Sequence, residues 1–334
     1  MDWVTYGRGF DAVFKQITDV NKQHKKNNSF FHYTSLENCI NILKKINDEN
    51  SICELWASNL AFLNDSMEYN DGYSILKDSL KKREDDFRKS ADEKELIQFY
   101  ERIINNDSKD LVFKKNIYAI CFCRDEDLLS QWKYYSNGGG IAIEFDLNKC
   151  AFLGNSVVNK DKTMECTNMS IDVVYEDKIK SSILDRRIND LLNVFSKNKD
   201  HKREYLKLEE DILLTFIGYF KDGNFKEEKE SRMLFLPLFK TMEDKRDVKD
   251  LIKYRVRNGK IIPFLKIIVK NQDEQYLPIK SLRIGPCKNQ QLIFQALSHF
   301  ISKDLELENI QIEKDGSCVV NGIKIIKSKI PFRE

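Results

Sequence analysis

The chain has 334 residues, enough for one large domain or about two of ordinary size. Hydrophobic residues make up 41% and aromatic residues 11% of the sequence, which excludes a globally disordered chain. The 55 Lys and Arg residues nearly balance the 53 Asp and Glu residues, which disfavours a strongly basic nucleic-acid-binding protein but leaves room for a local basic patch.

The hydropathy pattern and the cysteines predict a cytoplasmic protein. No apolar run approaches the roughly 18 residues of a membrane helix, and the first ten residues do not resemble a signal peptide. In the cytoplasm the 8 cysteines are expected to be reduced thiols. Because the cysteines and the 4 histidines lack the spacing of a metal site, we expect no bound metal.

The predicted elements alternate strands and helices along the chain. In order they are a helix over 9–25, the strand SFFHY with a helix after it, the strand ICELWAS, charged helices, the strand 116–123, the short helix DEDLLSQWKYYS and the strand IAIEFD. The chain continues with a strand near 171 and more charged helices. It is completed by strands over 225–239 and in LIKYRVR and GKIIPFLKIIV, an amphipathic helix and a closing hairpin.

The charged helical segments, at about 69–112 and 178–222, are typical of solvated helices. We interpret them as insertions in a single domain of residues 1–334, because no low-complexity linker divides the chain. Strands at both ends with helices between them favour an α+β fold over a doubly wound sheet.

Polar residues gather where the first strand meets its helix: His32, Tyr33, Thr34 and Ser35. Such a junction exposes the N–H groups of a helix N-terminus, which suit an anionic or hydroxyl-rich ligand. Alternatively, Thr34 or Ser35 caps the helix and His32 is a core histidine.

A second polar cluster follows the next strand and contains Ser58, Asn64 and Asp65 beside Trp56. These residues could line a cleft. Alternatively, Asn64 and Asp65 form an Asx-turn and Trp56 belongs to the core.

Trp132 and Tyr135 lie three residues apart on one face of a predicted helix. They could stack on a flat ring, although such a pair more often belongs to the core.

Two carboxylates and an arginine, Glu228, Glu230 and Arg232, alternate along a predicted strand and therefore share one of its faces. One carboxylate could stabilise a cationic transition state while the other orients an acceptor. The alternative is an exposed, charged strand edge.

The ordered blocks FHYTSLENCINILKK, LWASNLAFLNDSMEY, CFC, DLLSQWKYYS, GGIAIEFD, VVYED, FKEEKESR and LRIGP resemble the bacterial family named domain of unknown function 2971. The resemblance runs from about residue 30 to 326, with Phe225 where the family has Trp. The family name implies no activity, and the resemblance implies only a context of bacterial, antiphage defence or toxin-like proteins.

The HYTS block and the later Glu-x-Glu pair are also similar to ADP-ribosyltransferases. This resemblance implies a split-sheet core with helical insertions and NAD as the substrate. His32 would contact an NAD ribose and Ser58 would line the nicotinamide pocket. The implied cofactor-binding residues are His32, Tyr33, Thr34, Ser35, Ser58, Asn64, Asp65 and Arg232.

The same resemblance implies a metal-independent transfer of ADP-ribose to a protein or nucleic-acid acceptor, or NAD hydrolysis. Glu230 would stabilise the oxocarbenium-like transition state and Glu228 would contact the acceptor. The alternatives are a nucleotide-sensing module without turnover, a ribonuclease that uses His32 and the carboxylates, and an interaction scaffold. The sequence leaves the oligomeric state open.

Overall fold

The computed structural model describes residues 29–44, 52–63, 68–89, 94–135, 139–146, 148–154, 171–197, 202–235, 251–257, 259–273, 277–303, 310–313, 316–320 and 322–332. The expected helix over 9–25, and the residues Asn64 and Asp65, lie outside this set.

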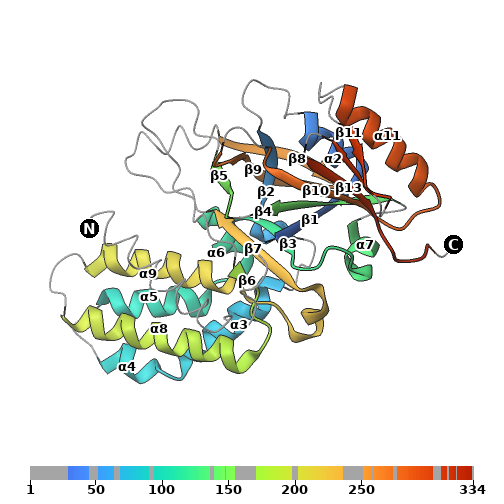
Figure 1. The fold of residues 1–334 in the computed structure, drawn as a ribbon. Coiled ribbons are helices and arrows are strands. Elements are labelled where there is room, and N and C mark those ends of the chain that lie inside the picture. The colour runs from blue at the N-terminus through green and yellow to red at the C-terminus, as the bar shows by residue number, and fades with distance from the viewer. Residues whose placement is uncertain are drawn as a thin grey trace.

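Within the described part of the chain, one sheet of 13 strands forms the centre of the fold (Figure 1). The strands are β1 (Ser29–Ser35), β2 (Cys53–Asn59), β3 (Tyr118–Cys123), β4 (Gly140–Asp146), β5 (Cys150–Gly154), β6 (Ile171–Asp172), β7 (Glu230–Phe235), β8 (Ile252–Arg257), β9 (Lys260–Asn271), β10 (Ile279–Ile284), β11 (Ile310–Ile312), β12 (Cys318–Val320) and β13 (Ile323–Lys327). The sheet is mixed, because β10 and β13 are parallel while the other pairs described here are antiparallel.

The sheet forks at β3. One edge of β3 pairs along its whole length with β7. The other edge is shared, because β1 joins it at Cys123 and β2 joins it at Ala119 and Tyr118. From this fork one wing continues through β4 and β10, and the other continues through β9 to β5 and β8.

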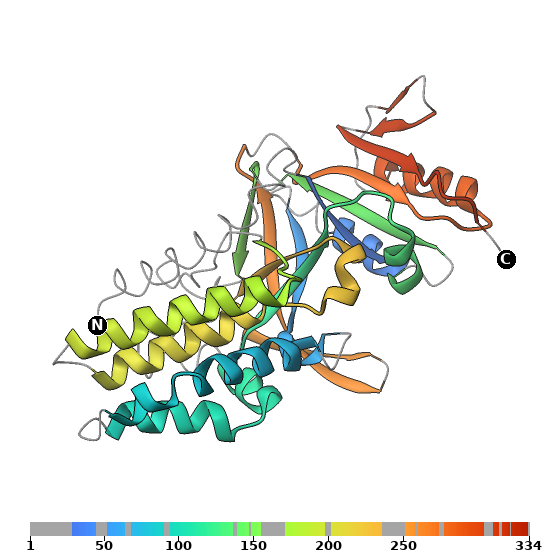
Figure 2. The ribbon, with the colours of Figure 1, turned by 90° about the horizontal axis from the view of Figure 1, so that it is seen from below.

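Most helices form a separate layer, which we call the helical unit. It comprises α3 (Glu68–Lys81), α4 (Glu84–Lys89), α5 (Lys94–Asn105), α6 (Ser108–Lys115), α8 (Asp177–Lys197) and α9 (Lys202–Ile217). Figures 1 and 2 show these helices stacked together beside the sheet. Buried side chains such as Leu76, Phe99, Leu184 and Leu213 form their common core, so the two charged segments bury their apolar faces against each other.

Alternating side chains give the sheet two distinct faces. The α2 face carries Ile120 and Phe122 and packs against α2 (Leu36–Leu43) and α11 (Gln290–Lys303). The opposite face, called here the α7 face, carries Ala119, Cys121 and Cys123. It is covered partly by α7 (Leu129–Tyr135) and partly by the helical unit.

The predicted combination of a sheet with several helices is confirmed at this level, and helices occupy both segments expected to be insertions. The predicted strand over 225–239 is corrected at its start. Gly223–Glu228 forms a 3₁₀ turn, η4, and β7 begins only at Glu230. Lys229 between them adopts a left-handed conformation with φ of 46°, which breaks the strand alternation before Glu230.

Candidate functional site

His32 lies on β1 beside the fork. Its Nδ1 is 3.1 Å from the carbonyl oxygen of Cys121, and its ring meets the Phe122 ring edge to face. Because a carbonyl only accepts, Nδ1 is the protonated nitrogen. Burial is the main cause that lowers the pKa of His32, and the charge of Arg255 lowers it further against the raising effect of the Cys121 hydrogen bond. His32 is therefore neutral near pH 7.

The other residues of the HYTS block make contacts that hold the fold. The Tyr33 hydroxyl donates to the carbonyl of Asp125 and accepts from the amide of Leu128. The Ser35 hydroxyl accepts from the amide of Asn38 and caps α2, as the capping alternative predicted. Thr34 is buried between them.

Ser58 lies at the end of β2, on the other arm of the fork, and its hydroxyl accepts a 2.7 Å hydrogen bond from Arg255 of β8. The Arg255 guanidinium also lies 5.5 Å from the Trp56 ring and 5.8 Å from the Phe264 ring, which stack on each other. Arg255 Nε is buried and has no hydrogen-bond partner. Burial, together with the charge of Arg257, lowers the pKa of Arg255 from its usual high value.

Glu230 is the centre of a buried ion network at the start of β7. Arg232 donates to both of its carboxylate oxygens, at 2.7 and 3.0 Å, and Lys221 donates at 2.8 Å. Lys221 also donates to Glu228 at 2.6 Å. Burial alone would raise the pKa of Glu230, but the charges of Arg232 and Lys221 lower it to about 2. Glu230 is thus an anion throughout the physiological range.

This network excludes the interpretation of an exposed strand edge. Every residue of β7 is buried, and the strand pairs with β3 on one side and β6 on the other. Arg232 is only 2% exposed and also donates to the carbonyl of Gly218. Glu228 lies in η4 rather than on the strand, so Lys221 and not strand alternation brings the two carboxylates together.

Strand register shows which of the predicted residues share a face. Glu230 pairs with Cys123, and Ser58 pairs with Ala119, so both lie on the α7 face. Phe31 is the residue of β1 that pairs with Cys123, so its neighbour His32 points to the α2 face and meets Phe122. Ser58 and Glu230 therefore face the same side of β3, whereas the register turns His32 to the other side.

The two aromatic residues of α7 divide into a core residue and a site residue. Trp132 is 2% exposed, packs on the Tyr33 ring at 4.6 Å and donates to Asp127 at 2.8 Å. Tyr135 is only partly buried, and the burial of its hydroxyl together with the nearby Cys121 and Glu230 raises its pKa. Tyr135 thus lies close to the Glu230 network.

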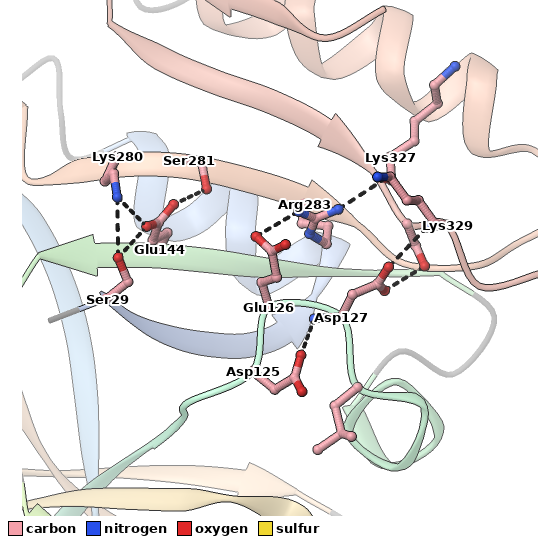
Figure 3. Close-up of polar contacts among 12 residues, drawn as sticks. Ser29, Asp125, Glu126, Asp127, Glu144, Lys280, Ser281, Arg283, Lys327 and Lys329 are labelled. Atoms are coloured by element: carbon pink, nitrogen blue, oxygen red, sulfur yellow. Dashed lines mark hydrogen bonds and ion pairs between the residues drawn. The ribbon is translucent and has the colours of Figure 1, made fainter. Parts of the chain in front are cut away.

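Two other carboxylates, buried Glu144 of β4 and partly exposed Asp127 of the loop before α7, are saturated by neighbouring donors (Figure 3). Glu144 accepts hydrogen bonds from Ser29, Ser281 and Lys280, each at 2.5–2.7 Å. Asp127 accepts from Trp132, from Ser328 and from the amide of Lys329, and so connects the loop before α7 to the end of the chain. These carboxylates stabilise the fold and leave little capacity for a ligand.

Arg255 and Lys221 are the site residues that sequence reasoning missed. The signal for Arg255 was present, because residues 251–271 contain six basic and no acidic residues, and three of the basic ones alternate in the strand IKYRVR. Nothing in the sequence singles out Lys221, which reaches Glu230 because a bridge between Val174 and Phe220 places it beside β7.

Neither a metal-binding cluster nor a helix that could cross a membrane is found among the described residues. No group of three or more His, Cys, Asp or Glu side chains in that part of the chain is arranged to hold a metal ion. Among the helices described here, none is long and apolar enough to cross a membrane.

A family model described as "Protein of unknown function (DUF2971)" matches residues 131–233. This match supports the expected family and includes most of α7, Lys221 and the Glu228–Glu230 pair, although it covers less than half of the chain. No curated protein and no solved structure matches the chain. The similarity to ADP-ribosyltransferases has no support from these comparisons.

Proposed function

We propose that this chain binds NAD on the α7 face of β3 and transfers its ADP-ribose to a macromolecular acceptor or to water. The observation that carries the proposal is the buried, unpartnered Nε–H of Arg255. A buried donor without an acceptor costs about 1–3 kcal/mol, and a phosphate oxygen of a bound nucleotide would satisfy it with a charge-assisted hydrogen bond.

The site is long enough for a dinucleotide. Ser58 and Arg255 lie level with Ala119 at one end of β3, and Glu230 lies level with Cys123 at the other end. Four residues along a strand span about 13 Å. In our proposal the phosphates lie near Arg255 and the nicotinamide ribose lies near Glu230, with partly exposed Cys121 between them.

In the proposed reaction the bond between ribose C1′ and the nicotinamide nitrogen breaks, and its electron pair leaves with neutral nicotinamide. An oxygen or nitrogen of the acceptor then bonds to C1′ and loses its proton. Glu230, ionised at working pH, offers negative charge to the cationic transition state. Glu228, which has Lys221 as its ion-pair partner and is more exposed, would take the proton. His32 supports the site indirectly through the carbonyl of Cys121.

A nucleotide-sensing module without turnover is a second candidate, because one observation favours it. Arg232 and Lys221 already neutralise Glu230, which weakens the field that this carboxylate can exert on a cation. The two candidates share the binding site and differ only in nicotinamide release.

The test is NAD titration by calorimetry together with an assay for free nicotinamide. Arg255→Gln should raise the Kd for NAD by about tenfold or more, the effect of losing one charge-assisted hydrogen bond. Arg257→Gln is the matched control, because Arg257 lies on the same strand and the same face but is exposed. Equal NAD affinity in the two variants would refute the site, and binding without nicotinamide release would favour the sensing module.

A further inference from the structure

The hairpin formed by β8 and β9 has one strongly basic face. The register pairs Arg257 with Lys260 and Arg255 with Ile262, so side-chain alternation puts Lys253, Arg255, Arg257 and Lys260 on the same side. Lys253, Arg257 and Lys260 are exposed. Figure 2 shows this hairpin in orange, projecting from the sheet beside the helical unit.

An exposed aromatic ring lies on this same face. Trp56 of β2 is 40% exposed, stacks on Phe264 of β9 with ring centroids 4.4 Å apart, and lies next to Arg255. The nearest described carboxylate, Glu54, is occupied, because it accepts a hydrogen bond from Trp56 Nε1 and pairs with Lys266 at 3.1 Å. Among the described residues, no ion pair links Lys253, Arg257 or Lys260 to an acidic side chain.

We propose that this face, the basic hairpin face, binds single-stranded nucleic acid. Alternate residues of a strand are about 7 Å apart, so the three exposed cations form a row that can follow a phosphate backbone. Trp56 offers a ring on which an unpaired base stacks. An acidic protein segment would match the charges but not the exposed indole, whereas a single strand matches both. The near-neutral total charge does not oppose this, because the basic residues are concentrated in 251–271.

The role of such a strand rests on the proposed function. The basic hairpin face adjoins the Ser58–Arg255 end of the proposed NAD site, whereas the ribose C1′ lies at the Glu230 end, about 13 Å along β3. The strand would serve as the acceptor of ADP-ribose through nucleotides that extend beyond the hairpin to Glu230. A nucleophilic oxygen or nitrogen of the strand would bond to ribose C1′ as nicotinamide leaves, and its proton would pass to Glu228. The binding of the strand itself does not depend on that reaction.

Fluorescence anisotropy with labelled RNA and DNA oligonucleotides of about 12 nucleotides tests the binding. The combined variant Lys253→Glu, Arg257→Glu and Lys260→Glu should bind about tenfold or more weakly, and the slope of log K against log salt should become shallower by about 2. Trp56→Ala should weaken binding about fivefold or more with little change in that slope. The matched control is Lys81→Glu, Lys82→Glu and Lys94→Glu, three exposed lysines of the helical unit.

Equal affinity of the wild type and the hairpin variant would overturn the proposal, as would the absence of oligonucleotide binding by the wild type. Tighter binding of a duplex than of the single strand would refute the stacking role of Trp56. NAD titration of the same proteins separates the two proposals. NAD binding without oligonucleotide binding defeats only this inference, and oligonucleotide binding without NAD binding defeats only the proposed function.

Discussion

Replacing Glu230 by Gln should destabilise the fold by about 3 kcal/mol at neutral pH. The depression of its pKa from 4.5 to about 2 corresponds to a stabilisation of about 3 kcal/mol by the ionised form. The variant leaves Arg232 and Lys221 without the anion that they share. Breaking a buried ion pair in this way generally costs about 3–5 kcal/mol, which agrees with the value from the pKa. Glu227→Gln is the control, since Glu227 is exposed and should change stability by no more than about 0.5 kcal/mol.

The pH dependence gives this prediction a second test. The folded-state pKa lies below the unfolded one, so the stabilisation is fully present above about pH 5 and is lost as the pH falls towards 2. Urea unfolding followed by circular dichroism measures the free energy of unfolding of wild type and Glu230→Gln. The difference between the two should decrease as the pH falls from about 5 to about 3. A difference in free energy of unfolding below about 0.5 kcal/mol at neutral pH, or a difference that does not change with pH, would refute the electrostatic reasoning.

Two further predictions concern the core and the chemistry. Trp132→Ala should lower the free energy of unfolding by about 3–5 kcal/mol without changing the Kd for NAD, because Trp132 lies in the core. Thermal melts together with NAD titrations would check this. Weaker NAD binding at unchanged stability would contradict it. Glu230→Gln should slow nicotinamide release about 10²–10³-fold, whereas Glu228→Gln should reduce acceptor labelling and leave NAD hydrolysis; wild-type release and labelling in both variants would exclude these carboxylates from the reaction.

Local patterns predicted the elements of the fold better than their arrangement. The apolar run of the strand 116–123 and the high charge density of the two helical segments were enough to identify β3 and the helices of the helical unit. The fork could not be read from the sequence, because it depends on β1 and β2 meeting the same edge of β3 at positions four residues apart. Such pairings are long-range contacts that leave no local signal.

The alternation argument failed at Glu228 for a local reason. A strand running through 225–239 was predicted from composition, but Asp222 caps the turn η4 by accepting from the amide of Asn224, and Lys229 then takes a left-handed conformation. The predicted alternation is valid only for Glu230 and Arg232, which both lie within β7. The side of the sheet that His32 faces follows from the long-range pairing of Phe31 with Cys123, which no local pattern shows.

The two arginines of the site, buried Arg232 and half-buried Arg255, differ in a way that assigns their roles. Arg232 donates to Glu230 and to the carbonyl of Gly218, so an anionic ligand could reach it only by displacing a carboxylate that burial and Lys221 hold in place. Arg255 has the hydroxyl of Ser58 and two aromatic rings as neighbours, and its Nε–H is unsatisfied. A phosphate at Arg255 would accept a hydrogen bond from a donor that otherwise has no acceptor. A phosphate at Arg232 would have to replace the hydrogen bonds that this arginine already makes. Ligand binding therefore favours Arg255, and Arg232, which the sequence placed among the cofactor-binding residues, serves to keep Glu230 ionised.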